Sequence, residues 1–376
     1  RLQRAWLGIR RWAAGTIAVS MAAALGSAPL TILHFGIFTP ISILASLVLL
    51  PMVFCLLGCA LFSAMVFSLS PGASKAVNHL NSWIADGTAG SAAMMAAVPG
   101  GHYFIGHDSR PRLIVYDLGY GAGAACFTDG HGAAVMLDCG SSGAFRYQVA
   151  PSLRRLAITP DAVVLSHPDG GHLGGGVAVW QQLPIRQAWL PVAFARSPSY
   201  RDWLEMAPAA GIRIIDADIR KLDFPDDAVM EVVHVPDPEN RHALADERVA
   251  IFRLHWRGWK ILFTSDAGMG TDLRLLDSGQ DLAADVIIAG RNRSDITLSD
   301  RLIEAVNPRL IIASNSPFPE SEWLPLGAVR YWQSRQILVV DQAESGGVTL
   351  SIDEDGSLVV EGFLTKETLR LEPEKR

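Results

Sequence analysis

The chain has 376 residues, of which 49% are hydrophobic and only 19% charged, with a mean hydropathy of +0.24. This composition excludes a disordered chain and collagen, and four Cys are too sparse for a disulfide scaffold. Residues 12–74 hold no Asp, Glu, Lys or Arg, whereas residues 71–376 carry 28 basic and 38 acidic residues, a formal charge of −10. Such an uneven distribution argues against a purely cytosolic protein. The chain begins at Arg1 without Met, so we expect it to be the tail of a longer polypeptide.

Two apolar runs near the N-terminus are predicted to cross a membrane. A bilayer core about 30 Å thick needs roughly 20 apolar residues per helix, so this uncharged stretch suffices for two spans. We expect them near residues 12–33 and 41–69, with a kink at Pro51, whose ring removes a helical hydrogen bond. A signal peptide or a buried helical pair fits this length poorly. The arginines in residues 1–11 favour a cytoplasmic flank. The number of spans stays open, and with it the side on which the rest of the chain lies.

The rest of the chain is predicted to be one α/β domain. We assign residues 1–74 to the membrane segments, 75–110 to a linker, 111–365 to the domain and 366–376 to a charged tail. Apolar runs alternate with amphipathic helical stretches, which predicts a two-sheet α/β layer protein. The predicted strands lie at 113–119, 124–128, 133–139, 161–166, 213–217, 230–235, 249–256, 260–266, 285–290 and 309–314, followed by two late strands near 336–341 and 347–353.

One hairpin turn is predicted at residues 129–132 (DGHG), where Gly tolerates positive φ. This turn places Cys126 opposite a residue near Val135, several positions from Cys139, so no disulfide between the two cysteines is expected.

The loop at residues 165–176 (LSHPDGGHLGGG) is the main candidate for chemistry. It follows a predicted strand and holds His167, Asp169 and His172, and a further carboxylate, Asp266, ends another strand. Imidazole nitrogen with carboxylate oxygen is what Zn²⁺ or Mn²⁺ prefers. Asp169 could equally cap the next helix, and the histidines could simply bond the backbone. The spacing alone leaves both interpretations open.

Several motifs together resemble the ComEC family of bacterial DNA-internalisation competence proteins. Residues 167–175 (HPDGGHLGG) are similar to the family's His-x-Asp-x-Asp-His-x-Gly-Gly motif. Residues 117–121 (DLGYG), 137–140 (LDCG) and 263–266 (FTSD) resemble its Asp-Val-Gly-Gln-Gly, Ile-Asp-Thr-Gly and Leu-Thr-Gly-Asp elements in the same order. The apolar stretch resembles the end of the family's membrane channel domain.

This resemblance implies a metallo-β-lactamase-like αββα sandwich preceded by transmembrane helices. It implies the C-terminal part of a multi-pass channel in the bacterial inner (cytoplasmic) membrane, through which DNA passes as a single strand. The partners it implies are single-stranded DNA, the lipid bilayer and other DNA-uptake proteins. By the same resemblance, Asp266 corresponds to an aspartate that bridges two metal ions.

The departures from the family pattern concern the metal site. Gly171 stands where the family has a second loop Asp, and residues 291–294 (RNRS) stand where it has His-His-Gly-Ser. His167, Asp169, His172 and Asp266 survive, which we interpret as at best one incomplete site for a weakly bound Zn or Mn, or for no metal at all. His234 ends a nearby strand and could contribute, although a lone histidine there is more often structural. No catalytic residue is assigned.

Arg291 and Arg293 admit three interpretations. A guanidinium could pair with Asp169 or Asp266 in place of a cation, or both could bind DNA phosphates, or both could be solvated loop charges. The domain's charge of −10 opposes general nucleic-acid affinity, and no pattern for sequence-specific DNA recognition is evident.

Two functions follow as hypotheses. The first is a DNA-uptake channel with a degenerate metallo-β-lactamase-like domain. The alternative is an active metal-dependent hydrolase that degrades the DNA strand that is not imported.

Overall fold

The computed structural model describes residues 2–104, 109–119, 123–174, 176–191, 197–206, 212–214, 219–237, 248–292, 295, 297–316 and 323–373. It divides into two compact units, residues 1–107 and 108–376, each of which is described by itself.

The N-terminal unit contains three long helices, α1 (Leu2–Phe35), α2 (Ile41–Phe67) and α3 (Pro71–Ala96), and a small antiparallel pair of strands, β1 (Ile37–Phe38) and β2 (Tyr103–Phe104). Two helical stretches, Arg10–Leu33 and Ile41–Phe67, are long and apolar enough to cross a membrane, judged by length and composition. They coincide with the two spans predicted from the sequence. Pro51 lies inside α2, as expected.

Helix α3 occupies much of the segment that the sequence suggests is a linker. Its start is fixed by Ser70, whose hydroxyl accepts a hydrogen bond from the Ala73 N–H at 3.3 Å, and by Pro71 at the first helical position. Helices α2 and α3 pack together, and the hydroxyls of Ser63 and Ser74 form a buried hydrogen bond of 2.9 Å between them. The short helical pattern in the sequence therefore belongs to a helix of 26 residues.

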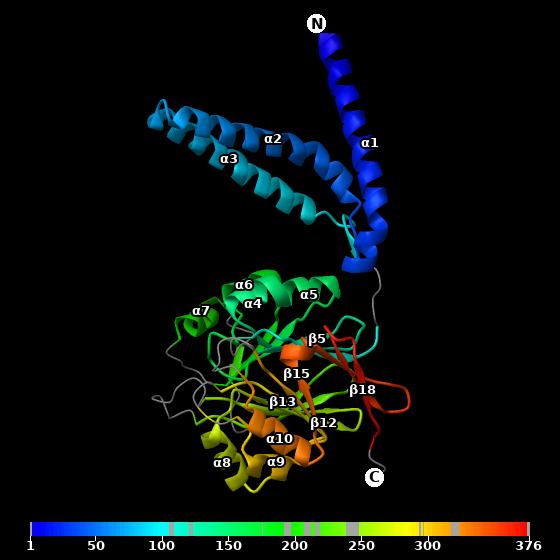
Figure 1. Ribbon diagram of the computed structural model, residues 1–376, viewed down its shortest axis with the longest axis vertical. Helices are drawn as coiled ribbons and strands as arrows, with labels where there is room; N and C mark the ends of the chain where they lie inside the picture. Colours follow the sequence, from blue (N-terminus) through cyan, green and yellow to red (C-terminus); the bar gives the residue numbers. More distant parts are fainter. Residues whose placement is uncertain are drawn as a thin grey trace. The chain divides into compact units, whose positions relative to one another are not determined.

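The second unit contains two mixed sheets (Figure 1). The nine-stranded sheet has the order β18-β17-β16-β3-β4-β5-β6-β7-β8 and the seven-stranded sheet the order β15-β14-β13-β12-β11-β10-β9. Strands β5 to β8 are parallel to one another, as are β12 to β15, and the other neighbours are antiparallel. The strands are β3 (Arg112–Val115), β4 (Ala124–Thr128), β5 (Ala134–Cys139), β6 (Ala162–Val164), β7 (Gln187–Leu190), β8 (Ile212–Ile214), β9 (Lys221–Asp223), β10 (Val229–His234), β11 (Ile251–Trp256), β12 (Trp259–Ser265), β13 (Val286–Ala289), β14 (Leu310–Ala313), β15 (Leu338–Asp341), β16 (Val348–Ile352), β17 (Leu358–Gly362) and β18 (Thr368–Leu371).

Helices cover the outer face of each sheet, so the unit has four layers (Figure 1). The nine-stranded sheet is covered by α4 (Ser142–Ala144), the π-helical segment Phe145–Val149, α5 (Ala150–Arg155), α6 (Val177–Gln182) and α7 (Pro198–Met206). The seven-stranded sheet is covered by α8 (Met269–Asp277), α9 (Asp300–Val306) and α10 (Leu326–Ser334), and the short α11 (Gln342–Ser345) follows β15.

Three apolar cores hold these layers together. The central one lies between the sheets and includes Phe127, Phe252 and Trp256, each at most 2% exposed. The others lie between each sheet and its helices. The predicted αββα sandwich is confirmed.

The hairpin between β4 and β5 turns where the sequence predicts. The Asp129 carboxylate accepts hydrogen bonds from three successive N–H groups, those of His131, Gly132 and Ala133, at 2.7 to 3.0 Å. Cys126 pairs with Met136 across the hairpin, and both domain cysteines are free, which confirms that no disulfide joins them.

The predicted charged tail differs from the structure. Residues 366–376 contribute β18, which pairs with β17 at the edge of the nine-stranded sheet. Leu371 is buried there while its neighbours remain accessible, because alternate side chains of a strand point to opposite faces.

Candidate metal site where strands of both sheets end

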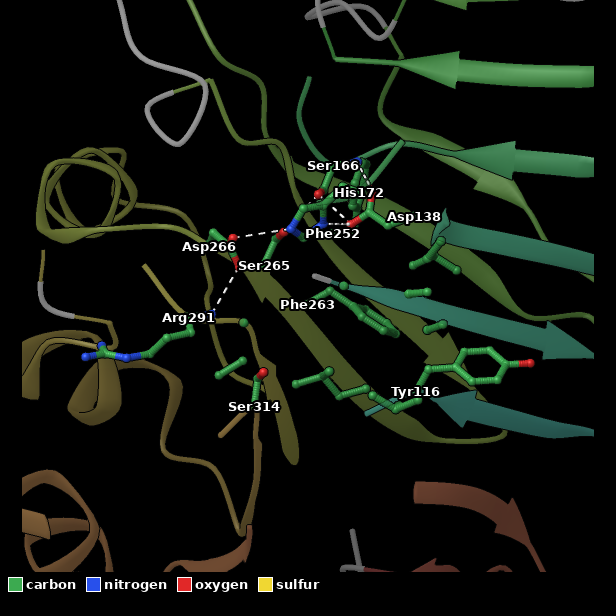
Figure 2. Close-up of a pocket in the computed structure, with 18 of the residues that line it drawn as sticks. Tyr116, Asp138, Ser166, His172, Phe252, Phe263, Ser265, Asp266, Arg291 and Ser314 are labelled. Carbon is green, nitrogen blue, oxygen red and sulfur yellow. Dashed lines mark hydrogen bonds and ion pairs between the residues drawn. The ribbon is translucent and has the colours of Figure 1, made fainter. Parts of the chain in front are cut away.

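The candidate site forms where β5 and β6 of one sheet and β12 of the other reach their carboxyl ends. Asp138 is the penultimate residue of β5, His167 and His172 follow β6, and Asp266 follows β12. Polar side chains gather at strand ends because the chain leaves the sheet there and its loops are free to turn inward. Figure 2 shows Asp138, Ser166 and His172 close together, with Asp266 beside them.

His172 lies between two carboxylates. Its Nδ1 is 2.9 Å from Oδ2 of Asp138, its Nε2 is 3.2 Å from Oδ2 of Asp266, and its side chain is only 2% exposed. Burial alone would lower the pKa of His172, but the negative charges of Asp266 and Asp138 outweigh burial and hold this pKa well above its ordinary value. The raised pKa favours the protonated ring, whose single positive charge offsets part of the negative charge of Asp138 and Asp266.

The pKa of His167 is shifted in the opposite direction from that of His172. Burial and the neighbouring charge of His172 lower the pKa of His167 to about 3, so its ring is neutral. Its Nδ1 is 2.8 Å from Oγ of Ser166, which leaves Nε2 buried without a hydrogen-bond partner. That nitrogen lies 3.9 Å from Oδ2 of Asp266. A neutral imidazole with a free lone pair, facing a carboxylate, is a metal-ligand arrangement.

Asp138 is the site residue that the sequence analysis missed. Its carboxylate accepts hydrogen bonds from the N–H of Ser166 at 2.7 Å and the hydroxyl of Ser166 at 2.6 Å, and it contacts His172. Its φ of 54° is a left-handed conformation that turns the strand end toward the loop. The resemblance of residues 137–140 to a family motif was the signal that could have identified Asp138. That motif placed an aspartate at a strand end but gave it no role.

Asp169 does not reach the cluster of Asp138, His167 and His172. One of its carboxylate oxygens accepts a hydrogen bond from the N–H of Gly171 at 2.9 Å, which closes a local turn. Burial opposes ionisation of Asp169, but the Gly171 N–H and the two histidines lower its pKa nonetheless. Asp169 thus closes its own turn in this structure, and its role as a metal ligand stays a prediction.

Arg291 does not neutralise Asp266 with its guanidinium. The main-chain N–H of Arg291 donates to Oδ1 of Asp266 at 3.0 Å, whereas its side chain points away from the pocket and donates to Oγ1 of Thr297 at 3.3 Å (Figure 2). The interpretation that pairs Arg291 with Asp266 in place of a cation is therefore wrong for its guanidinium, and it is His172 that lies between the two carboxylates. Arg293 lies outside the described residues.

His234, at the end of β10, is not part of the cluster in the described part of the chain. Its Nε2 is buried without a partner, and burial together with Arg274 lowers the pKa of His234 to about 4.

Two glycines make room for the site. A Cβ on Gly123 would lie 2.6 Å from Cε1 of His172, and one on Gly290 would lie 2.2 Å from Oδ1 of Asp266. Both distances are too short for any side chain, so the backbone approaches these two groups only because of glycine. Beside them is a cavity of about 70 Å³, whose wall is mostly apolar and includes Phe252 and Phe263.

The described residues offer one group for a metal ion. Asp138, His167 and His172 can each direct a ligand atom so that all lie within 4.8 Å of one another, and Asp266 borders the group. The unpartnered Nε2 of His167 suits a single Zn²⁺ or Mn²⁺, cations that bind imidazole nitrogen together with carboxylate oxygen. Because both nitrogens of His172 already contact carboxylates, a metal ion would have to displace the His172 proton.

Comparisons with known proteins agree with this architecture. Residues 1–128 match the competence protein family model, and residues 119–285 match the metallo-beta-lactamase superfamily model. Among curated proteins, none matches the chain.

Three solved structures are among those to which this chain is similar. The metallo-beta-lactamase fold protein YhfI from Bacillus subtilis is 14% identical, with 62% of this chain and 96% of that chain covered and a TM-score of 0.38. Igni18, a metallo hydrolase from the archaeon Ignicoccus hospitalis, is 12% identical, with 64% and 100% covered and a TM-score of 0.43. A long form RNase Z from yeast is 11% identical, with 58% and 39% covered and a TM-score of 0.35.

The two family matches follow each other along the chain, and the first includes both apolar helices. This chain therefore carries a competence-protein (ComEC) domain followed by a metallo-β-lactamase domain.

Proposed function

We propose that this chain is a component of a multi-pass DNA-uptake channel in the bacterial inner membrane, and that its metallo-β-lactamase domain has a degenerate metal site. The competence-protein match and the two apolar helices support the first part. In this proposal DNA passes as a single strand and is not recognised by sequence, and other DNA-uptake proteins complete the channel.

The position of His172 is the observation that carries the second part. A two-metal hydrolase uses one cation to generate hydroxide and another to stabilise the leaving oxygen. Here the His172 imidazole, at 2.9 and 3.2 Å from Asp138 and Asp266 and with a raised pKa, offsets part of the carboxylate charge that a second cation would need. An imidazolium offers no open coordination position, and Gly171 supplies no ligand in place of the family's Asp. A dinuclear site is therefore not expected.

A hydrolase with one metal ion, acting on the DNA strand that is not imported, is the second candidate. The buried, unpartnered Nε2 of His167 favours it. His167 and His172, with Asp138 or Asp266, would hold the ion, and Ser166 would keep the His167 ring in orientation through its 2.8 Å contact with Nδ1. A bound Zn²⁺ or Mn²⁺ would supply Lewis-acid polarisation of water or of a phosphate oxygen.

Metal content and nuclease activity separate the two candidates. We expect the purified full chain in detergent to hold no more than one equivalent of metal and to leave labelled single-stranded DNA intact in Zn²⁺ or Mn²⁺. The matched variants are His167→Ala, which removes the free ring nitrogen, and Asp169→Ala, which changes only the loop. Cleavage that is lost with His167→Ala but kept with Asp169→Ala contradicts the degenerate site and supports the hydrolase.

The uptake role has its own test. Deletion of the gene should abolish natural transformation by purified DNA, and the unmodified chain should restore it. Normal transformation in the deletion strain contradicts the role in DNA uptake, whatever the metal content.

A further inference from the structure

The helical segment at residues 142–155 carries an exposed cationic surface away from the metal site. It packs against the nine-stranded sheet through buried side chains that include Phe145, Val149 and Leu153. On its outer side, Arg146, Tyr147, Arg154 and Arg155 are exposed, and the Tyr147 side chain is 74% exposed. We call these four residues the cationic face. No acidic residue occurs from 139 to 160, although the chain after residue 70 has a formal charge of −10.

The spacing places the four side chains along one side of the helical segment. Arg146 and Tyr147 lie in the π-helical part and precede Arg154 and Arg155 of α5 by eight residues. All four side chains are exposed, whereas Val149, Ala150 and Leu153 between them are buried against the sheet. The cationic face is therefore a short stripe with charge at both ends and an aromatic ring in it.

The three arginines of the cationic face form few interactions with other described residues of the chain. Arg154 donates to the amide oxygen of Gln182 at 3.2 Å, and Arg146 and Arg155 form no ion pair or hydrogen bond with any described residue. Three other exposed arginines of the same domain are each paired with a carboxylate: Arg257 with Asp226, Arg335 with Glu304, and Arg370 with Asp353 and Asp355. Other exposed arginines, such as Arg186, Arg201 and Arg301, also lack a carboxylate partner among the described residues, so the distinguishing feature is the cluster: three arginines within residues 146–155, in a stretch from 139 to 160 without any acidic residue. Such a local excess of positive charge in an acidic domain favours an anion from outside the chain.

The exposed ring of Tyr147 distinguishes between two anionic ligands, a membrane surface and single-stranded DNA. A membrane surface is bound by a helix that exposes several large apolar side chains beside its cations. Between residues 109 and 272, Tyr147 is the one large aromatic or aliphatic side chain among the described residues that is strongly exposed. A single strand of DNA needs only what this face offers, because arginines contact its phosphates and one aromatic ring stacks on one base.

We propose that the cationic face formed by Arg146, Tyr147, Arg154 and Arg155 is a contact surface for single-stranded DNA. This inference rests on the proposed role in DNA uptake and assigns that role a surface. Phosphate contacts and base stacking carry no sequence information, so the surface binds any single strand and binds it less tightly as salt rises.

Salt dependence tests the arginines. The full chain is placed in nanodiscs of the neutral lipid phosphatidylcholine, and binding of a fluorescent oligothymidylate is followed by anisotropy as the salt concentration rises. The slope of log K against log salt should fall in magnitude by about 2 in R146Q/R154Q/R155Q, because each phosphate contact to a single strand contributes about 0.7. The control R257Q/R335Q/R370Q has the same net charge change on paired arginines, and its slope should stay unchanged.

Substitution of Tyr147 tests the stacking. Tyr147→Ala should weaken binding by between about 5-fold and 150-fold, the range that stacking of one base gives, whereas Tyr147→Phe should retain the affinity. All four side chains are exposed, so unchanged thermal melting serves as the folding control for these variants.

Three results overturn the inference: equal slopes for the two triple variants, Tyr147→Ala binding as tightly as the unmodified chain, or no DNA binding by the unmodified chain. A membrane contact is the rival outcome, and it is indicated if R146Q/R154Q/R155Q loses only its association with phosphatidylglycerol vesicles. Transformation of the deletion strain decides the proposed function separately, because it asks whether the chain is needed and not which surface DNA touches.

Discussion

Replacing His172 by Ala should destabilise the metallo-β-lactamase domain strongly. The imidazole contacts Asp138 at 2.9 Å and Asp266 at 3.2 Å, and its side chain is 2% exposed, so solvent screens the two contacts little. Removing one partner of a buried ionic group typically costs about 3–5 kcal/mol, because it leaves a charge unpaired. We expect a loss in this range for His172→Ala. The control His131→Ala changes an exposed side chain in the hairpin turn and should stay within about 0.5 kcal/mol.

The pH dependence of stability identifies the imidazolium. The pKa of His172 is raised in the folded state, so the folded chain keeps a proton that the unfolded chain releases around pH 6.5. This contribution is complete below pH 6.5, declines by about 1.4 kcal/mol per pH unit above it, and is lost once the pH passes the folded-state pKa. The difference in stability between the unmodified chain and His172→Ala should therefore shrink as pH rises.

Pulse proteolysis in urea, with a chelator present, measures these free energies on the full chain. A second variant separates charge from packing: adding Asp266→Asn to His172→Ala should recover part of the stability, because it removes a carboxylate left without its partner. A difference that does not change with pH, or further destabilisation in the double variant, would refute the imidazolium bridge.

Three further predictions follow from the site. Metal titration read by inductively coupled plasma mass spectrometry should give at most one ion per chain, lost in His167→Ala and kept in Asp169→Ala; two ions would contradict the assignment of ligands. Arg291→Ala should change thermal stability by less than about 1 kcal/mol, whereas Arg291→Pro, which removes the N–H bonded to the site carboxylate, should cost about 1–3 kcal/mol. Gly123→Ala should cost a similar amount, because its Cβ would lie 2.6 Å from the bridging imidazole, while Gly143→Ala has nothing within 4 Å and should be neutral in the same melting assay.

Local patterns in the sequence predicted most, but not all, elements of this fold. The charge-free stretch predicted both apolar helices, and short runs rich in apolar residues predicted twelve strands of the second unit, but not β7, β9, β17 and β18. The turn at residues 129–132 was predictable because its glycines and Asp129 make their contacts within the turn. The length of helix α3 was underestimated because its polar residues weaken the periodic signal. Strand β18 was missed because residues 366–376 are rich in charge and were predicted to be a tail.

The site was only partly predictable, since its ligand set is decided by contacts between distant segments. Asp138 gains its role from Ser166, 28 residues away, and from His172, 34 residues away. The expectation that Arg291 neutralises the carboxylates rested on formal charge, in which histidine counts as neutral. The neighbouring carboxylates of Asp266 and Asp138 raise the pKa of His172, so a formal count that treats this histidine as neutral underestimates the positive charge at the site. Asp169 accepts a local hydrogen bond from Gly171 in its own turn, and its role as a ligand stays a prediction.

Ser265 has a consequence for how the site responds to the rest of the domain. It ends β12 at a register irregularity, with a φ of 47°, and its hydroxyl is 2.8 Å from that of Ser166, which follows β6 of the other sheet. This hydrogen bond links the two sheets next to the candidate metal site. Any local opening of the sandwich along this edge must break it, and would separate Asp266 from the histidines. The site is therefore intact only while the two sheets are in contact at this edge. When the edge opens, amide hydrogen exchange at Ser166 and Asp266 should increase together.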